Sequence, residues 1–316
     1  MRRRIVCLLL TALLALSFTG CASQRHTGSD KLQVVCTLFP YYDFVRQIGG
    51  GDVDVTLLVT AGREVHSFEP TPLDAIRLSE ADVFIYNGGE SEEWVEDLLE
   101  AAGENIGSVL AMMDYADVLA EEIQEGMQVR EDGDEEDSDE IEYDEHIWTS
   151  PVIAMKLCRV IGEALMEADP VHADGYRARL DSYLARLAAL DRDFRQVVDG
   201  AKRTTLVFGD RFPLLYFCRT YALDYRAAFH GCSGDTEPSL ATLKYLIDKV
   251  ESENIPVVYT IELSSRKIAG AIADTTGAKV LTFQSCQTVS RADFEGGETY
   301  LSLMYRNVDA LREGLQ

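Results

Sequence analysis

Residues 171–198, VHADGYRARLDSYLARLAALDRDFRQVV, are the stretch that decides the architecture of this chain. Apolar and aromatic side chains recur along it at near-heptad spacing, which predicts one amphipathic helix. Roughly 28 residues at 1.5 Å per residue give a helix of about 42 Å, long enough to join two separate lobes. The side chains on its apolar face are Tyr176, Leu180, Tyr183, Leu184, Leu187, Leu190 and Phe194.

On both sides of this helix, short β-branched runs alternate with amphipathic segments. Such alternation predicts βαβ units and mainly parallel sheets. We therefore expect an α/β fold with two lobes, residues 32–170 and 201–316, joined by a linking helix over residues 171–200. Open α/β sheets bind ligands beyond the carboxyl ends of their strands, so the site is expected in the cleft between the lobes. The expected strands are 33–39, 53–59, 83–86, 205–208, 225–229, 257–261 and 279–283.

The first residues indicate export. Arginines at positions 2–4 precede an apolar run over residues 5–16, which is too short to span a bilayer and is typical of a signal peptide covering residues 1–20. The following Ser-Phe-Thr-Gly-Cys over 17–21 resembles a bacterial lipobox, which implies cleavage before Cys21 and a lipid on its thiol. An ordinary signal peptide with an incidental cysteine is the alternative. We expect residues 21–31 to be a lipidated tether that holds the protein outside the bacterial membrane.

Acidic residues dominate the charge of the chain, whose formal net charge is −25. This charge argues against nucleic-acid binding, which requires a basic surface, and it suits a protein that gathers cations. Fourteen of the twenty-five residues in segment 121–145 are Asp or Glu. Such a block predicts a mobile, solvated insertion that attracts cations without forming the tight site.

Two cysteines of the second half each follow an expected strand. Cys232 and Cys286 lie in loops that we expect at the same edge of the sheet, and an extracytoplasmic location permits disulfides. We therefore predict that they pair. Two separate thiols are the alternative.

Two histidines follow extended segments at the cleft-facing end of the first lobe, and neutral imidazole is the commonest protein ligand for zinc. His66 begins the stretch HSFEPTPLD over residues 66–74, and His146 lies in EHIWTSP over residues 145–151. The two stretches resemble the first and second metal-ligand motifs of the zinc- and manganese-binding proteins of ABC importers. The resemblance extends over about residues 33–315.

This resemblance implies a monomeric solute-binding lipoprotein, not an enzyme, that captures zinc (manganese being possible) for the permease subunit of an ABC importer. It also implies ligands from the second lobe, where the chain departs from the family. The usual histidine position holds Gly209, and the loop over 284–289 contains no carboxylate. Asp210 and Glu262 are therefore the expected oxygen donors, although Asp210 is equally suited to capping a helix or pairing with Arg211. His230 is a further candidate.

Two other classes of protein are open alternatives: a surface-exposed zinc hydrolase and a metal-dependent adhesin. A catalytic zinc site also uses three protein ligands, with an open fourth position. The chain contains no HExxH, GxSxG or Walker glycine loop, which disfavours the hydrolase.

Overall fold

Two four-stranded parallel sheets form the centres of the two lobes. The computed structural model describes residues 31–65, 68–128, 141–231 and 237–316. The first sheet has the order β2-β1-β3-β4 and the second the order β6-β5-β7-β8, and all neighbouring strands pair in parallel. The expected α/β fold with two mainly parallel sheets is thereby confirmed. The strands are β1 (Leu32–Cys36), β2 (Val53–Leu57), β3 (Val83–Tyr86), β4 (Ser108–Ala111), β5 (Thr205–Phe212), β6 (Asp224–His230), β7 (Val257–Thr260) and β8 (Lys279–Thr282).

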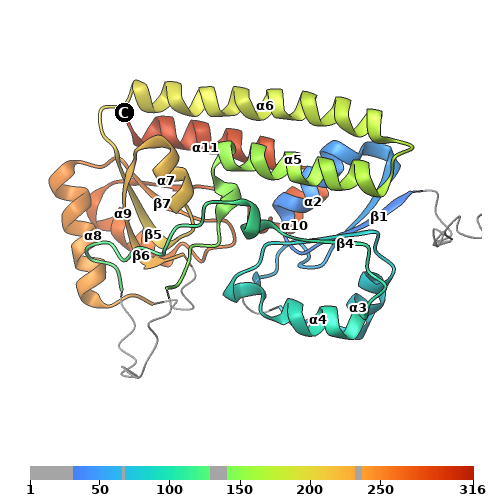
Figure 1. Cartoon of the computed structure of the whole chain (residues 1–316). Helices are drawn as coiled ribbons and strands as arrows, with labels where there is room; N and C mark the ends of the chain where they lie inside the picture. Colours follow the sequence, from blue (N-terminus) through green and yellow to red (C-terminus); the bar gives the residue numbers. More distant parts are fainter. Residues whose placement is uncertain (1–30, 66–67, 129–140, 232–236) are drawn as a thin grey trace, which may run out of the picture. The chain divides into compact units, whose positions relative to one another are not determined.

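Helices surround these sheets and connect their strands (Figure 1). Short 3-10 helices occupy turns among the described residues: η2 (Gly50–Asp52), η4 (Glu90–Glu92), η5 (Met112–Tyr115) and η6 (Ile147–Thr149). The α-helices are α2 (Phe39–Gly49), α3 (Pro72–Ser79), α4 (Trp94–Ala102), α5 (Pro151–Ala168), α6 (Ala173–Asp199), α7 (Leu215–Tyr221), α8 (Leu240–Glu253), α9 (Lys267–Thr276), α10 (Arg291–Glu295) and α11 (Tyr300–Gly314). None of the helices that the structure describes is both long and apolar enough to span a membrane.

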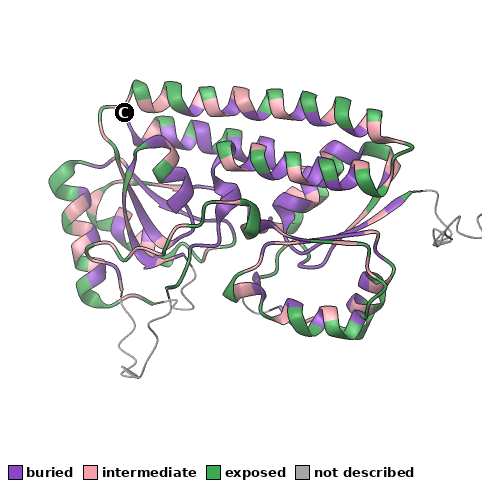
Figure 2. Ribbon diagram, viewed as in Figure 1, coloured by how far each residue is buried: buried purple, intermediate pink, exposed green. Residues whose placement is uncertain are grey.

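The long helix forms as its apolar spacing predicts. Helix α6 has 27 residues and packs against α2 and α5 of the first lobe and against α7 and α11 of the second. Its exposed residues lie on the side away from α5 and α11 (Figure 2). One continuous apolar core therefore extends from the first lobe into the second. Six residues of the predicted face are buried, namely Tyr176, Leu180, Tyr183, Leu187, Leu190 and Phe194.

The last helix fastens the second lobe to the first. Tyr300 begins α11, and its backbone N–H donates to the buried Asp43 of α2 at 2.9 Å. Its hydroxyl donates to the carbonyl of Trp148 at 2.7 Å, and its ring packs edge-on against Phe44 at 4.9 Å. The C-terminal helix thus contacts both α2 and the turn before α5, where the second predicted metal motif lies.

The acidic segment differs from the expected mobile insertion at both of its ends. Ala120 and Tyr143 pair as an antiparallel bridge, so the two ends of the segment run side by side. Met127 is buried, and the backbone N–H of Gln128 donates to the carbonyl of Ala228 on β6 at 2.9 Å. An apolar anchor and backbone pairing therefore outweigh charge repulsion at residues 121–128 and 141–145. Residues 129–140 lie outside the described residues.

Candidate metal site

The turn that carries His146 is held by hydrogen bonds on both sides of the residue. The carbonyl of His146 accepts from the backbone N–H of Thr149 at 3.1 Å and from its hydroxyl at 2.7 Å. The backbone N–H of His146 donates to Oδ1 of Asp144 at 2.8 Å. Ser150 then caps α5, whose first residue is Pro151, a residue suited to the first turn of a helix. This local sequence fixes the imidazole in one place.

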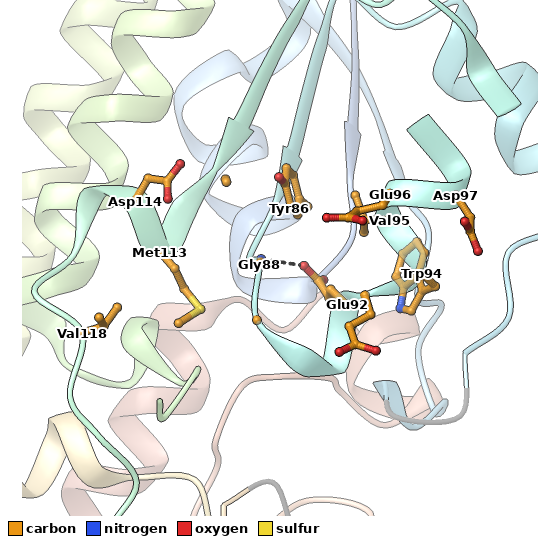
Figure 3. A pocket seen from close by; sticks show the side chains of 13 residues that line it. Tyr86, Gly88, Glu92, Trp94, Val95, Glu96, Asp97, Met113, Asp114 and Val118 are labelled. Atoms are coloured by element: carbon orange, nitrogen blue, oxygen red, sulfur yellow. Dashed lines mark hydrogen bonds between the residues drawn. The ribbon is translucent and has the colours of Figure 1, made fainter. Parts of the chain in front are cut away.

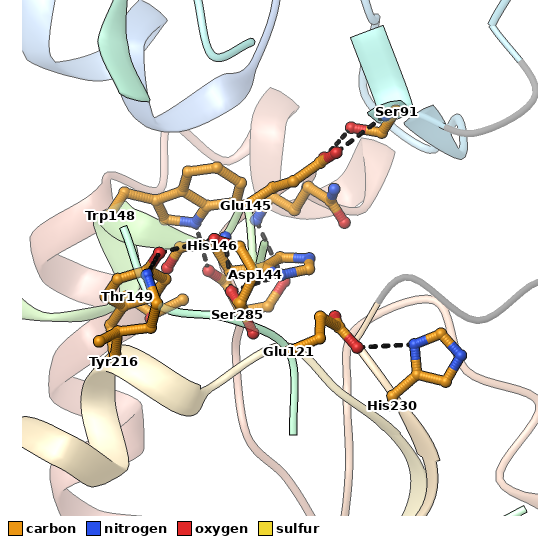
Figure 4. Close-up of polar contacts among 12 residues, drawn as sticks. Ser91, Glu121, Asp144, Glu145, His146, Trp148, Thr149, Tyr216, His230 and Ser285 are labelled. Atoms are coloured by element: carbon orange, nitrogen blue, oxygen red, sulfur yellow. Dashed lines mark hydrogen bonds and ion pairs between the residues drawn. The ribbon is translucent and has the colours of Figure 1, made fainter. Parts of the chain in front are cut away.

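The imidazole of His146 has the hydrogen-bonding pattern of a metal ligand. Its Nδ1 lies 3.2 Å from Oδ1 of Asp144 (Figure 4). A proton on Nδ1 donates to this carboxylate oxygen and leaves the lone pair of the neutral imidazole on Nε2. Nε2 is buried and has no hydrogen-bond partner among the described residues. Metal-binding histidines characteristically donate their other ring N–H to a carboxylate in this way.

Burial alone would lower the pKa of His146, but nearby carboxylates have the opposite effect and together outweigh burial. Asp144 has the largest opposing effect, followed by Glu145 and Glu121, and together they raise the pKa of His146 above its ordinary value. The imidazole therefore lies in a strongly negative environment. Such an environment attracts a divalent cation as well as a proton.

A second set of residues, which the sequence did not identify, supports the turn from the first lobe. The amide of Asn87, at the end of β3, donates to the carbonyl of Glu145 at 3.0 Å and accepts from the hydroxyl of Tyr41. The buried carboxylate of Glu145 accepts from the backbone N–H of Ser91 at 2.9 Å and from its hydroxyl. These polar contacts span distant parts of the sequence, and no local pattern indicates them.

An acidic pocket of about 890 Å³ lies at the carboxyl ends of β3 and β4 (Figure 3). His146 is not among its lining residues, so this pocket is separate from the candidate metal site. The buried carboxylate of Glu92 at its edge accepts from the backbone N–H groups of Asn87 and Gly88 at 2.6 and 3.0 Å. Burial raises the pKa of Glu92 to about 7. Glu92 therefore shapes the turn that carries Asn87.

Replacing Glu92 by glutamine is expected to change how stability depends on pH. The folded state keeps a proton on Glu92 that the unfolded state has lost, so wild-type stability should fall as pH rises from about 4.5 to about 7. At about 1.4 kcal/mol per pKa unit, the advantage of the variant should grow by on the order of 3 kcal/mol across that range. Urea unfolding at pH 5 and pH 8 measures this, with Glu93→Gln at the exposed neighbour as control. An equal pH response in Glu92→Gln and wild type would contradict it.

Glu262 of the second lobe is buried and already hydrogen-bonded. It follows β7, and its carboxylate accepts from the backbone N–H of Ser285 at 2.7 Å and from its hydroxyl. Burial raises the pKa of Glu262, while the bonds from Ser285 oppose that rise. The carbonyl of Ser285 in turn accepts from the indole N–H of Trp148 at 2.8 Å. Ser285 thus connects Glu262 to the turn that carries His146.

Asp210 is also engaged, in the middle of β5. Its carboxylate accepts from the backbone N–H of Arg211 at 2.9 Å and from that of Ile261 at 3.3 Å. The guanidinium of Arg211 pairs with Glu64 at 3.1 Å. Asp210 therefore pairs with the backbone of Arg211, whereas the side chain of Arg211 pairs with Glu64 of the first lobe.

The glycine at the family's usual histidine position has a steric cause. A Cβ atom at Gly209 would lie 2.5 Å from the Cα of Ala269, because α9 packs directly against β5 here. No side chain fits at this position unless the helix moves. The absence of a histidine at residue 209 is therefore built into the packing of this lobe, and other residues must supply its ligands.

His66 lies outside the described residues, as does Ser67 beside it. The flanking residues Val65 and Phe68 are both buried in the first lobe. Among the described residues, no three His, Cys, Asp or Glu side chains are already gathered around one point that could hold a metal ion. The structure shows the surroundings of His146, Asp210 and Glu262 separately and does not bring the three into one cluster.

The predicted disulfide is not supported. Cys286 is a free thiol with 0% exposure, and burial raises its pKa well above the ordinary value. Cys232 lies outside the described residues. Two loops at the same sheet edge are not enough for a disulfide to form. Cys286 packs in the apolar core rather than at the surface of its loop.

Two parallel α/β lobes spanned by one long helix are the architecture of a two-lobe binding protein. The turn that contacts both lobes carries a buried imidazole whose Nε2 has no partner among the described residues. The chain belongs to the family of ZnuA, the zinc-uptake complex component A (periplasmic), whose model matches residues 34–314. Membership in this transport family, rather than the lack of a catalytic motif, supports a binding protein over an enzyme.

Named relatives agree with this family. The high-affinity zinc uptake system protein ZnuA of Bacillus subtilis is 31% identical over 310 residues, covering 94% of this chain and 93% of the relative. The zinc-binding lipoprotein AdcA of Streptococcus pneumoniae is 30% identical over 98% of this chain. The chain spans 60% of the length of that AdcA relative.

Solved structures share the fold. The metal-dependent lipoprotein YcdH from Bacillus subtilis superposes with a TM-score of 0.75 at 29% identity, covering 90% of this chain and 99% of that structure. The Zn(II)-bound ZnuA-like domain of Streptococcus pneumoniae AdcA gives a TM-score of 0.72 at 28% identity, with coverage of 90% and 99%.

Proposed function

We propose that this protein captures zinc outside the cytoplasmic membrane and delivers it, as a monomer, to the permease subunit of an ABC importer. The observation that carries the proposal is His146, whose Nε2 is buried and without a partner among the described residues while Asp144 holds Nδ1. A buried polar atom left unsatisfied costs about 1–3 kcal/mol, so it is retained where a ligand uses it. The family and the zinc-binding relatives support zinc as that ligand.

The ligands that we propose are His66 and His146 from the first lobe, with Asp210 and Glu262 as oxygen donors from the second. Two imidazole nitrogens with one or two carboxylate oxygens suit the tetrahedral preference of zinc. The same mixture accepts manganese, but the general order of affinities favours zinc. Each oxygen of a carboxylate has two lone pairs, so the existing hydrogen bonds of Asp210 and Glu262 leave sites for a metal.

We also propose that a lipid on Cys21 anchors the protein after removal of residues 1–20. Cys21 lies outside the described residues, and the support is the lipobox-like sequence together with relatives that are named lipoproteins. A Cys21→Ser variant should move from the membrane fraction to the soluble fraction of cells. A variant that stays in the membrane fraction would count against the lipid anchor.

Metal content of the purified protein tests the function directly. The chain should retain one zinc ion, and should prefer zinc to manganese in competition with a chromophoric chelator. Model ester, phosphate and peptide substrates should not be hydrolysed by the zinc-loaded protein. Zinc-dependent hydrolysis would favour the zinc hydrolase, whereas a protein that retains no metal after equilibration would overturn the proposal. A metal-dependent adhesin would bind zinc and also an extracellular matrix protein, which a solid-phase binding assay would show.

A further inference from the structure

We propose that Glu121 and His230 join His146 in coordinating the captured metal ion, so that the first residue of the acidic segment is a ligand. The metal is zinc if the proposed function holds, and the inference rests on that function. His230 supplies a donor from the second lobe, where Gly209 and the loop over residues 284–289 offer none at the family's usual positions. Glu121 and His230 then take the places of Asp210 and Glu262 in the ligand set.

The fold fixes Glu121 beside the turn that carries His146. The backbone N–H of Glu121 donates to the carbonyl of Glu142 at 2.9 Å, and that of Asp144 donates to the carbonyl of Leu119 at 2.9 Å. These bonds flank the bridge between Ala120 and Tyr143. Glu121 therefore lies on one of two antiparallel chain segments that pair with each other. The other segment leads directly into Asp144 and His146.

Glu121 also contacts the second lobe. Its carboxylate lies 2.7 Å from Nδ1 of His230, the last residue of β6 (Figure 4). The side chains of Glu121 and His230 are 9% and 20% exposed, respectively, so the pair is mostly shielded from water. This contact joins the start of the acidic segment to the carboxyl end of β6. Carboxyl ends of parallel strands are where such sheets bind ligands.

Gly231 lies directly against both His146 and Glu121. A Cβ atom on Gly231 would lie 3.2 Å from Cε1 of His146, 3.1 Å from Oε1 of Glu121 and 3.1 Å from the carbonyl oxygen of Phe212. One point therefore adjoins the imidazole of His146, a carboxylate oxygen and a backbone oxygen. Nε2 of that same imidazole is the atom for which the described part of the chain offers no partner. Only hydrogen atoms occupy this position in the present chain, because residue 231 is glycine.

The chemistry of these donors suits a divalent cation. Two imidazoles and one carboxylate are a common ligand set for zinc, and the fourth position accepts water or another ligand. The three side chains adjoin one another but do not yet surround one point. Binding then requires Glu121 and His230 to exchange their mutual ion pair for bonds to the metal through side-chain rotation.

The competing explanation is that Glu121 and His230 form a structural ion pair with no role in binding. Glu121→Gln and His230→Asn separate the two, because each removes a donor while keeping a similar shape. Each variant should lower zinc affinity by about 10–100-fold or more in a chelator competition, since loss of even an outer-shell partner has an effect of that size. The absorption spectrum of the Co²⁺-loaded protein should also change, which a structural ion pair would not cause.

Matched controls are available in the chain. Glu122→Gln removes the adjacent carboxylate, which pairs with Arg219, and His172→Asn breaks the pair between His172 and Asp169 on the surface. Both should leave zinc affinity and the Co²⁺ spectrum unchanged. A loss of affinity in Glu122→Gln equal to that in Glu121→Gln would show that only negative charge matters, and would overturn the inference.

Gly231→Ala provides a test that keeps every donor. The added methyl group should press on His146 and Glu121, whose atoms lie 3.1–3.2 Å from its position, and lower zinc affinity by at least about 10-fold. Gly270→Ala on α9, where a Cβ atom meets nothing within 4 Å, is the control. Thermal melting of the apo proteins confirms that each variant folds. If wild type binds zinc tightly and Gly231→Ala, Glu121→Gln and His230→Asn all match it, the inference fails while the proposed function stands. If wild type binds no zinc, the proposed function itself fails.

Discussion

Replacing His146 by glutamine is expected to lower the affinity for zinc by more than about 100-fold, beyond the 10–100-fold that the loss of an outer-shell partner causes. The reason is that His146 alone combines full burial, a carboxylate on Nδ1 and an Nε2 without a partner among the described residues. Glutamine preserves a polar side chain of similar length but offers only an amide, which is a poor zinc ligand. The protein should remain folded, because the backbone bonds of the turn involve Thr149 and Asp144 rather than the imidazole.

Competition with a chromophoric chelator measures the affinity, and circular dichroism with thermal melting shows whether the apo variant folds. His172→Gln is the matched control, because its imidazole also faces an aspartate, at 2.6 Å, but starts a helix on the surface. It should bind zinc as wild type does. If His146→Gln is folded and still binds zinc with wild-type affinity, His146 is not a ligand and the proposed site is wrong.

The long helix and all the described strands except β4 could be predicted because their causes are local. Heptad spacing over residues 171–198 requires only that one face of a helix be apolar, and α6 buries six of the seven residues expected on that face. The position of His146 was also predictable, since an N-cap serine and Pro151 mark the start of a helix directly after it. Sequence patterns within about thirty residues were enough for these features.

The second half of the site could not be predicted, because it depends on contacts between distant residues. The sequence shows the glycine at residue 209 but not the helix α9 that packs against it and excludes a side chain. The pairing of Glu121 with His230 joins residues that are more than a hundred positions apart. The contacts of Glu262 with Ser285 are equally non-local.

The acidic segment shows why composition misled the prediction at its ends. Charge density predicts a solvated loop when nothing else anchors the chain. Here the buried Met127 and the backbone bond from Gln128 to Ala228 anchor the first part of the segment. The bridge between Ala120 and Tyr143 holds the two ends of the segment together. Met127 and the few other apolar residues in this charged stretch were the available sequence signal. Any deletion intended to remove the acidic charge should therefore spare residues 121–128 and 141–145.

Replacing Trp148 by alanine is expected to lower the free energy of unfolding by about 3–5 kcal/mol, the usual cost of truncating a large buried aromatic residue. The indole is fully buried and packs edge-on against Tyr41 at 6.0 Å and against His146 at 5.5 Å. Its N–H donates to Ser285, whose own N–H and hydroxyl hold Glu262. The truncation thus removes core packing and also the link between the turn of His146 and the second lobe.

Trp148→Phe separates these two effects, because it keeps an aromatic ring and removes the donor. It should cost about 1–3 kcal/mol, mostly from leaving the buried carbonyl of Ser285 unpaired. Urea unfolding followed by far-ultraviolet circular dichroism measures both losses, in the presence of a chelator because bound zinc would add its own stabilisation. Trp94→Phe is the control, since the indole N–H of Trp94 donates to Ser91 at 3.2 Å from a partly exposed position. If Trp148→Phe is no less stable than Trp94→Phe, the bond to Ser285 contributes little, and core packing alone holds Trp148 in place.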